Sequence, residues 1–299
     1  MFVTWFLTGP LVYAALALLA AGTAYRIAVL YRMPCHLRWD LYPIPRLGPA
    51  GSKYQQADRD APRRHYPLAE LMFMAEEILL LRKVFAQRRG LWIGSWLMHA
   101  GLYLVACFLG LLLVAAVLKL VGAQWAVDGE QWTVGSGMLA GGLRTCTVAV
   151  GLGGMAAGLL GTLWLLVFRL TDRGLRGMSD PVSYFNLVLL AAMFAAGLAV
   201  GSADPGFAEC RGHLASLLCG RPGVVQSPWL TTAIVLTAIF IAAFPFGRMF
   251  HPVAKFFFYH KILWDDEPVR PGSAMEKEIG QCLGRRVGWS AEHVVAGGT

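Results

Sequence analysis

The chain has 299 residues, of which 57% are hydrophobic and only 15% are charged, and its mean hydropathy is +0.54. Soluble domains carry about 25% charged residues, so this composition excludes an ordinary soluble enzyme, a disordered chain, a coiled coil and a small disulfide scaffold. The formal net charge of +8 suits binding to nucleic acid or to an anionic membrane surface, and the position of the charges decides between the two.

Five apolar stretches are each long enough to cross a bilayer, which takes about 20 residues. They cover residues 2–30, 91–118, 143–170, 181–203 and 229–250. The first stretch is too long for a signal peptide and has no basic residue before Arg26. The sequence therefore predicts an all-α integral membrane protein. We expect a five-helix membrane domain over residues 1–264 and a C-terminal tail over residues 265–299.

Lys and Arg residues are concentrated after the first, third and fifth stretches, whereas the opposite side holds Lys119, Arg144, Arg211 and Arg221. Because positively charged loops stay in the cytoplasm, we expect the N-terminus outside and the C-terminus inside. The long first loop, residues 32–90, is then cytoplasmic. These expectations describe a multi-pass protein of the cell inner membrane, and they explain the basic surplus without nucleic acid.

The first loop contains a segment with helical spacing of apolar residues that begins at Pro67. The recurring positions are Leu68, Leu71, Met72, Ala75, Leu79 and Arg82, with glutamates between them. This pattern predicts an amphipathic helix, which lies either on the lipid surface or against a soluble partner. The segment from His260 to Thr299 mixes Trp264 and Trp289 with charged residues, which favours docking on a protein partner or on the first loop.

The six cysteines include no CxxC pair and no haem-attachment or iron–sulfur motif. Cys210 and Cys219 both fall in the outside-facing segment between the fourth and fifth stretches, where the compartment is oxidising. Their spacing permits either a disulfide or two free thiols, because spacing alone does not establish geometry. The other four are predicted to be free thiols or small packing residues.

Two of the seven histidines belong to apolar stretches, His99 to the second and His251 to the end of the fifth. An ionisable side chain in a membrane helix is costly and marks a functional candidate. His99 follows Arg89 by about 10 residues and His251 precedes Lys261 by the same interval, so in regular helices both lie about 15 Å from the cytoplasmic end. Two imidazoles at one depth are the ligands of haem b.

The alternative hypothesis is a haem-free scaffold or small transporter in which these histidines bind each other or a proton. The small residues expected to leave room for a flat macrocycle are Gly94, Ala100, Gly101 and Gly247. Arg248 is one turn from His251 and is expected either to bind a haem propionate or to extend to the cytoplasmic interface. The remaining histidines are predicted to be surface or interface residues: His36, His65, His213, His260 and His293.

The histidine early in the second stretch and the segment FPFGRMFH over residues 244–251 resemble the gamma subunit of respiratory nitrate reductase. The segments CHLRWDLYPIP (35–45) and EILLLRK (77–83) are more similar to the membrane cytochromes of sulfate-reducer redox complexes, the DsrM, HmcE and TmcC types. The resemblance covers essentially the whole chain. It implies a quinone-interacting cytochrome b whose haem is held by His99 and His251.

The same resemblance implies the partners. They are menaquinone or a similar quinone, a cytoplasmic iron–sulfur subunit like that of heterodisulfide reductase and, in some complexes, a periplasmic multihaem cytochrome c. The nitrate reductase pattern has a second histidine pair, but Leu109 and Ala233 stand at those places here and neither can ligate iron. We therefore expect one haem b in an electron-transfer subunit of anaerobic respiration, which is not a complete enzyme alone.

Overall fold

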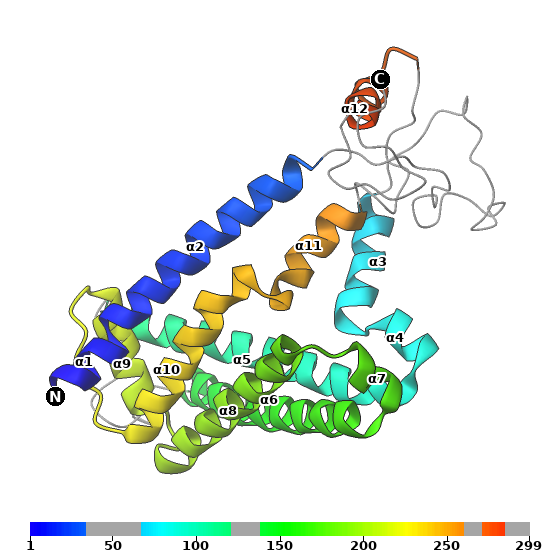
Figure 1. Ribbon diagram of the computed structural model, residues 1–299. Coiled ribbons are helices and arrows are strands. Elements are labelled where there is room, and N and C mark those ends of the chain that lie inside the picture. Colours follow the sequence, from blue (N-terminus) through cyan, green and yellow to red (C-terminus); the bar gives the residue numbers. More distant parts are fainter. Residues whose placement is uncertain (34–66, 121–137, 260–270, 285–299) are drawn as a thin grey trace. The chain divides into compact units, whose positions relative to one another are not determined.

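The computed structural model of the chain describes residues 1–33, 67–120, 138–259 and 271–284 (Figure 1). The described residues form helices and contain no β-strand, which confirms the all-α class. The chain divides into two compact units, one of Met1–Gly22 with Glu76–Arg248 and the other of Thr23–Ala75 with Met249–Thr299. The predicted domain boundary at residue 264 lies outside the described residues and stays a prediction.

Within the described residues, five helical segments are long and apolar enough to cross a membrane: Phe2–Tyr31, Arg89–Leu118, Gly141–Thr171, Pro181–Ala203 and Pro228–Phe246. They confirm the five predicted stretches, and the first four agree closely at both ends. Large apolar side chains on these segments are exposed, including Leu160, Val167 and Val188. Such exposure suits a surface that faces lipid, and the chain is a multi-pass membrane protein.

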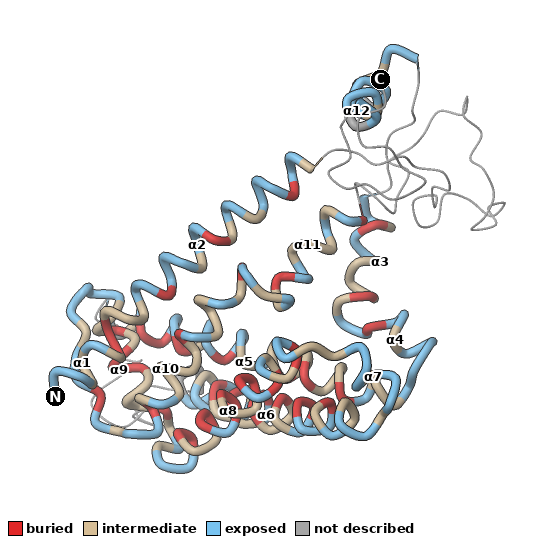
Figure 2. The backbone as a smooth tube through the Cα atoms, viewed as in Figure 1, coloured by how far each residue is buried: buried red, intermediate tan, exposed pale blue. Residues whose placement is uncertain are grey.

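The first unit is a bundle of packed helices. It contains α1 (Phe2–Thr8), the beginning of α2 (Pro10–Tyr31), α4 (Arg82–Gln87), α5 (Arg89–Leu120), α6 (Met138–Thr171), α7 (Arg173–Met178), α8 (Pro181–Ala203), α9 (Ala208–Leu218) and α10 (Pro228–Ala243). Helices α5, α6 and α8 lie side by side (Figure 1), while α10 packs on α8 and α9 on α5. Buried residues gather where these helices meet (Figure 2).

The second unit contains the rest of α2, most of α3 (Pro67–Leu79), α11 (His251–Phe258) and α12 (Ala274–Leu283). Helix α3 begins at Pro67, where the amphipathic helix is predicted, but it stops before Arg82, the last position of the predicted pattern. It ends at Leu79, and Leu81 then adopts the left-handed conformation with φ of 50° before α4 begins. A non-glycine residue in this conformation is uncommon, so the turn between α3 and α4 is a defined feature of the chain.

Several helix ends follow from local sequence signals. The Asp180 side chain accepts a hydrogen bond from the backbone N–H of Ser183 at 2.9 Å, and Pro181 occupies the start of α8. The Ser227 side chain accepts one from Leu230 in the same way, with Pro228 at the start of α10. Such residues satisfy N–H groups that lack an intrahelical partner, and proline needs none. These signals explain why the fourth and fifth spans begin where they do.

The fifth span is shorter than predicted, because its helix breaks before residue 250. Helix α10 ends at Ala243, and two short 3₁₀ segments, η2 (Phe244–Phe246) and η3 (Arg248–Phe250), separate it from α11. Pro245 has no N–H to continue the helical ladder, and Gly247 is extended with ψ of −177°. The predicted continuous helix over residues 229–250 is therefore wrong. The rise of 1.5 Å per residue of a regular helix does not apply across this break, so the depth predicted for His251 loses its basis.

Candidate functional site

His99 belongs to an aromatic face of α5 formed by Trp92, Trp96, His99 and Tyr103. Their spacing of four, three and four residues places the side chains along one side of a helix. The Trp92 and Trp96 rings stack with centroids 5.8 Å apart, and the His99 and Tyr103 rings lie 6.3 Å apart. The candidate histidine thus shares one side of α5 with three aromatic rings.

The aromatic face holds the end of α3. The indole N–H groups of Trp92 and Trp96 donate to the carbonyls of Leu80 and Leu79 at 2.7 and 3.1 Å. The Tyr103 hydroxyl donates to the carbonyl of Ile78 at 2.8 Å. The last carbonyls of a helix have no intrahelical partner and need other hydrogen-bond donors. Side chains of α5 therefore stabilise the turn between α3 and α4, an arrangement that the sequence analysis missed.

The His99 ring is oriented by its own helix. Nδ1 lies 2.6 Å from the carbonyl oxygen of Ser95, one turn earlier, and the residue is half-buried. A carbonyl oxygen only accepts, so Nδ1 carries the proton and donates, and Nε2 carries the lone pair of the neutral ring. A histidine that ligates a metal donates its second ring N–H to such a carbonyl or carboxylate. The geometry at His99 fits that role.

His251 lies in the second unit, where it is the first residue of α11 and is exposed. Its neighbour Phe250 is fully buried, and the guanidinium of Arg26 lies 5.6 Å from the centre of that ring. At the other end of α11, Tyr259 meets Phe73 edge-on with ring centroids 5.8 Å apart. These contacts anchor α11 within its unit. Because His99 and His251 belong to different units, their pairing stays a prediction.

Arg248 makes an ion pair with Asp180, with Nη2 and Oδ2 2.8 Å apart, and its Nη1 donates to the Ser183 hydroxyl at 3.3 Å. Hydrogen bonds from Ser183 and the nearby guanidinium hold the pKa of the Asp180 carboxyl below its usual range. The pair joins the start of α8 to the break after α10. Arg248 was expected to bind a propionate or to extend to the cytoplasmic interface, whereas its observed partner lies 68 residues earlier in the chain.

Two of the glycines predicted to make room for a macrocycle serve helix packing instead. A Cβ at Gly94 would collide with Trp164, and one at Gly101 would collide with the backbone of Gly158 on α6. Gly101 follows His99 by two residues and so lies on the opposite side of α5. The expectation for these two positions is therefore wrong, because α5 uses this side to approach α6 closely.

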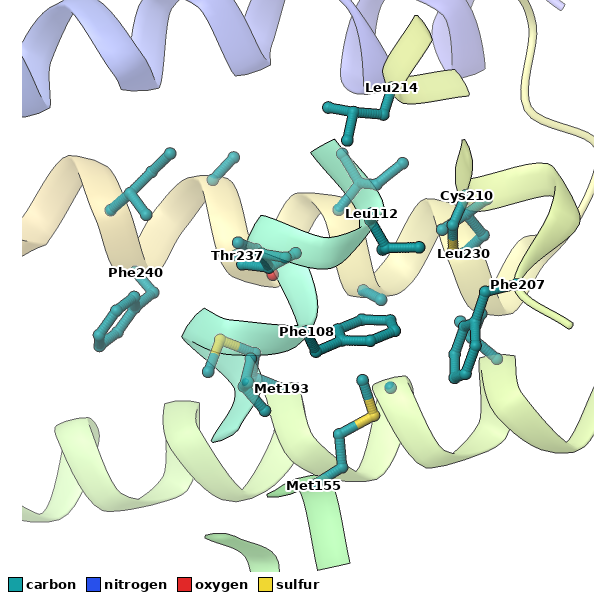
Figure 3. Close-up of a pocket in the computed structure, with 18 of the residues that line it drawn as sticks. Phe108, Leu112, Met155, Met193, Phe207, Cys210, Leu214, Leu230, Thr237 and Phe240 are labelled. Carbon is teal, nitrogen blue, oxygen red and sulfur yellow. The ribbon is translucent and has the colours of Figure 1, made fainter. Parts of the chain in front are cut away.

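Leu109 and Ala233 line the same cavity, which has a volume of about 360 Å³. Figure 3 shows other side chains that line it. Its walls come from α5, α8, α9 and α10, with Val12 and Met155 added. The resemblance places a second pair of haem ligands at these two positions. In the structure both positions line this one cavity. Neither side chain has an atom that ligates iron.

Helix α9 covers one end of this cavity and carries a buried histidine. Nε2 of His213 lies 2.8 Å from the carbonyl oxygen of Thr8, and the Tyr13 hydroxyl donates to the carbonyl of Leu217 at 2.6 Å. These bonds join α9 to α1 and α2. His213 was predicted to be a surface or interface residue, but it is only 9% exposed. A lone histidine in a short polar connection gives no sequence signal of burial.

The two cysteines of this connection are free thiols, which decides the question that spacing left open. Cys210 lies in the first turn of α9 and Cys219 follows its last residue. Nine residues of helix separate their Cα atoms by about 13 Å, whereas a disulfide needs about 6 Å. Burial raises the pKa of the Cys210 thiol to about 12, with Asp204 and Glu209 adding to the effect.

We expect His213 to make the protein less stable at mildly acid pH. Burial lowers its pKa from 6.5, although the Thr8 carbonyl and Glu209 act in the opposite direction. The unfolded chain therefore binds a proton first, so stability is lost as the pH falls below about 6.5 and through the folded pKa. The melting temperature in detergent should fall between pH 7 and pH 5, and His213→Gln should flatten this dependence. Parallel pH profiles for the two proteins would contradict the assignment.

The other predicted histidines, His36, His65, His260 and His293, lie outside the described residues, as does Cys35. Among the described residues, no three His, Cys, Asp or Glu side chains are grouped so that they could hold a metal ion. Haem b differs from such centres in needing two axial side chains.

The described helices define a multi-pass membrane protein with an oriented histidine on its second span. No protein-family model matches the chain, and no curated protein matches it.

Proposed function

We propose that this protein is a haem b-containing electron-transfer subunit of a membrane redox complex, with His99 and His251 as the axial ligands. The observation that carries the proposal is the hydrogen bond from Nδ1 of His99 to the Ser95 carbonyl. This bond holds the ring in one orientation and leaves the lone pair on Nε2, as iron ligation requires. When bound, haem b supplies a one-electron carrier inside the membrane.

The chain's own residues have distinct tasks in this proposal. Ser95 orients His99, and the aromatic face of α5 keeps the end of α3 beside it. His251 supplies the second imidazole at the start of α11, immediately after the break in the fifth span. Arg248 precedes His251 by three residues and brings a positive charge that suits a propionate. The contacts of Phe250 with Arg26 and of Tyr259 with Phe73 position α11.

The proposed partners follow from the distribution of charge and from the resemblance. In this proposal the protein lies in the cell inner membrane with its basic segments in the cytoplasm. The first loop and the tail then face a cytoplasmic iron–sulfur subunit like that of heterodisulfide reductase. Exposed cations such as Arg173 and Arg176 would steer an acidic partner to that side. Menaquinone, or a periplasmic multihaem cytochrome c, would exchange electrons with the complex. The chain is then one subunit of a quinone-linked oxidoreductase.

Purified protein should contain one haem b per chain. A dithionite-reduced spectrum should show the α band of haem b, and a pyridine haemochrome assay should give one haem for each polypeptide, since Leu109 and Ala233 cannot ligate a second. A colourless protein would overturn the proposal and favour a histidine pair in a haem-free scaffold or small transporter. Two haems per chain would show that another ligand pair exists.

Arg248→Gln should lower the midpoint potential of the haem, because a nearby positive charge favours the reduced iron. Asp180→Asn is the matched control, since it removes the ion pair seen in the structure but keeps the guanidinium charge. We expect its potential to stay the same or to rise. Equal decreases in both variants, measured by redox titration, would show that Arg248 acts only through its pair with Asp180.

A further inference from the structure

The cavity that contains Leu109 and Ala233 has a lining of uncharged side chains (Figure 3). Its wall is almost entirely aliphatic and aromatic, and Phe108, Met193 and Phe240 project toward it. No lysine, arginine, aspartate or glutamate belongs to the described residues that line it. A cavity of this composition offers nothing to a charged ligand.

The polar side chains in the wall are also uncharged. His213 is neutral because burial lowers its pKa, and its Nε2–H is donated to the Thr8 carbonyl. Cys210 remains a thiol at physiological pH, because burial raises its pKa to about 12. Thr237 adds a hydroxyl. Water in a protein cavity needs two to four polar partners, so this wall favours an apolar occupant over water.

The size of the cavity is also informative. A dry cavity of about 150 Å³ lined by Leu, Ile and Phe binds benzene. The volume of about 360 Å³ here is more than twice as large, so it holds an apolar group of a dozen or so carbon atoms. Most of its walls come from the spans that contain α5, α8 and α10, where the surrounding solvent is hydrocarbon, and α9 covers one end.

We propose that this cavity binds a hydrocarbon chain, supplied by the acyl tail of a membrane lipid or by the isoprenoid tail of a quinone. The hydrocarbon chain lies among α5, α8, α9 and α10. It supplies contacts that these helices do not make with one another at the cavity. Each methylene group that enters gains the contacts of an apolar wall. This proposal rests on the shape and polarity of the first unit and does not depend on haem.

Photolabelling of the purified full-length protein tests the proposal. The probe is a phosphatidylethanolamine with a diazirine in the middle of one acyl chain, added in detergent, and labelled residues are located by mass spectrometry. We expect labelling at Leu112 and Met193, which line the cavity and are only 3% and 9% exposed. Labelling confined to outward-facing positions such as Val188 would overturn the proposal.

Ala233→Phe fills the cavity and should reduce labelling of Leu112 and Met193 severalfold. Ala195→Phe is the matched control, because Ala195 is exposed on α8 and is not part of the cavity wall. Labelling of Leu112 and Met193 in Ala195→Phe should equal that in the unmodified protein. Equal labelling of the cavity residues in all three proteins would contradict the proposal.

Competition for labelling in the unmodified protein distinguishes an acyl chain from an isoprenoid tail. This measurement tests the proposal even if Ala233→Phe does not fold. Excess unlabelled phosphatidylethanolamine or menaquinone-4 is added before irradiation. Stronger competition by the lipid identifies an acyl chain, and stronger competition by menaquinone-4 identifies an isoprenoid tail. Cavity labelling that neither compound reduces is non-specific and would overturn the proposal.

Discussion

Replacing His99 with alanine should give a folded membrane protein that contains no haem b, and His251→Ala should have the same effect. Each change removes one of the two proposed axial ligands, and we expect the single remaining imidazole not to hold the haem through membrane extraction and purification. The haem content of the purified variants, measured as pyridine haemochrome per polypeptide, should fall to background. Helical content by circular dichroism should stay unchanged, since the spans are independent of this ligand.

His213→Ala is the control for these two variants. It removes an imidazole that donates to the Thr8 carbonyl and that has no part in the proposed ligation, so it should retain its haem. A normal haem content in His99→Ala would defeat the assignment of the site. Loss of haem in His99→Ala but not in His251→Ala would keep the first ligand and show that the second is another residue.

Removal of the tail from Asp265 onward should release the proposed cytoplasmic iron–sulfur subunit and leave the expected haem spectrum intact. The tail contains α12, on which Glu276, Lys277 and Glu278 are exposed to solvent. A helix with an exposed charged face at the end of a membrane protein suits docking of a soluble partner. The measurement is co-purification of the partner with an affinity-tagged full-length or truncated chain, together with the reduced visible spectrum.

A chain that ends after residue 284 provides the matched control, because it keeps α12 and lacks only the last segment. We expect this shorter deletion to retain the partner. Unchanged co-purification after removal of the whole tail would place the docking surface on the first loop instead. Loss of the haem spectrum together with the partner would show that the tail also supports the membrane domain.

The amino-acid sequence by itself determined the all-α class, the five spans and the amphipathic helix that begins at Pro67. These features depend on the length and period of apolar runs, which act locally, because every backbone group in lipid must be bonded within its own helix. The start of α8 at Pro181 is also determined locally, because the residues that cap the helix are three positions apart. His99 also emerged from sequence alone, because an ionisable side chain within an apolar run is conspicuous.

Only the tertiary structure decided how the side chains of these helices are used. The hydrogen bonds from Trp92 and Trp96 to α3, the ion pair of Arg248 with Asp180 and the burial of His213 each join residues far apart in the chain. Gly101 likewise lets α5 approach α6 closely. The sequence around Gly101 does not indicate that α6 is the neighbouring helix. Spacing along one helix predicts which side chains share a face. It does not predict what that face meets, because the partner is selected by packing among all the helices.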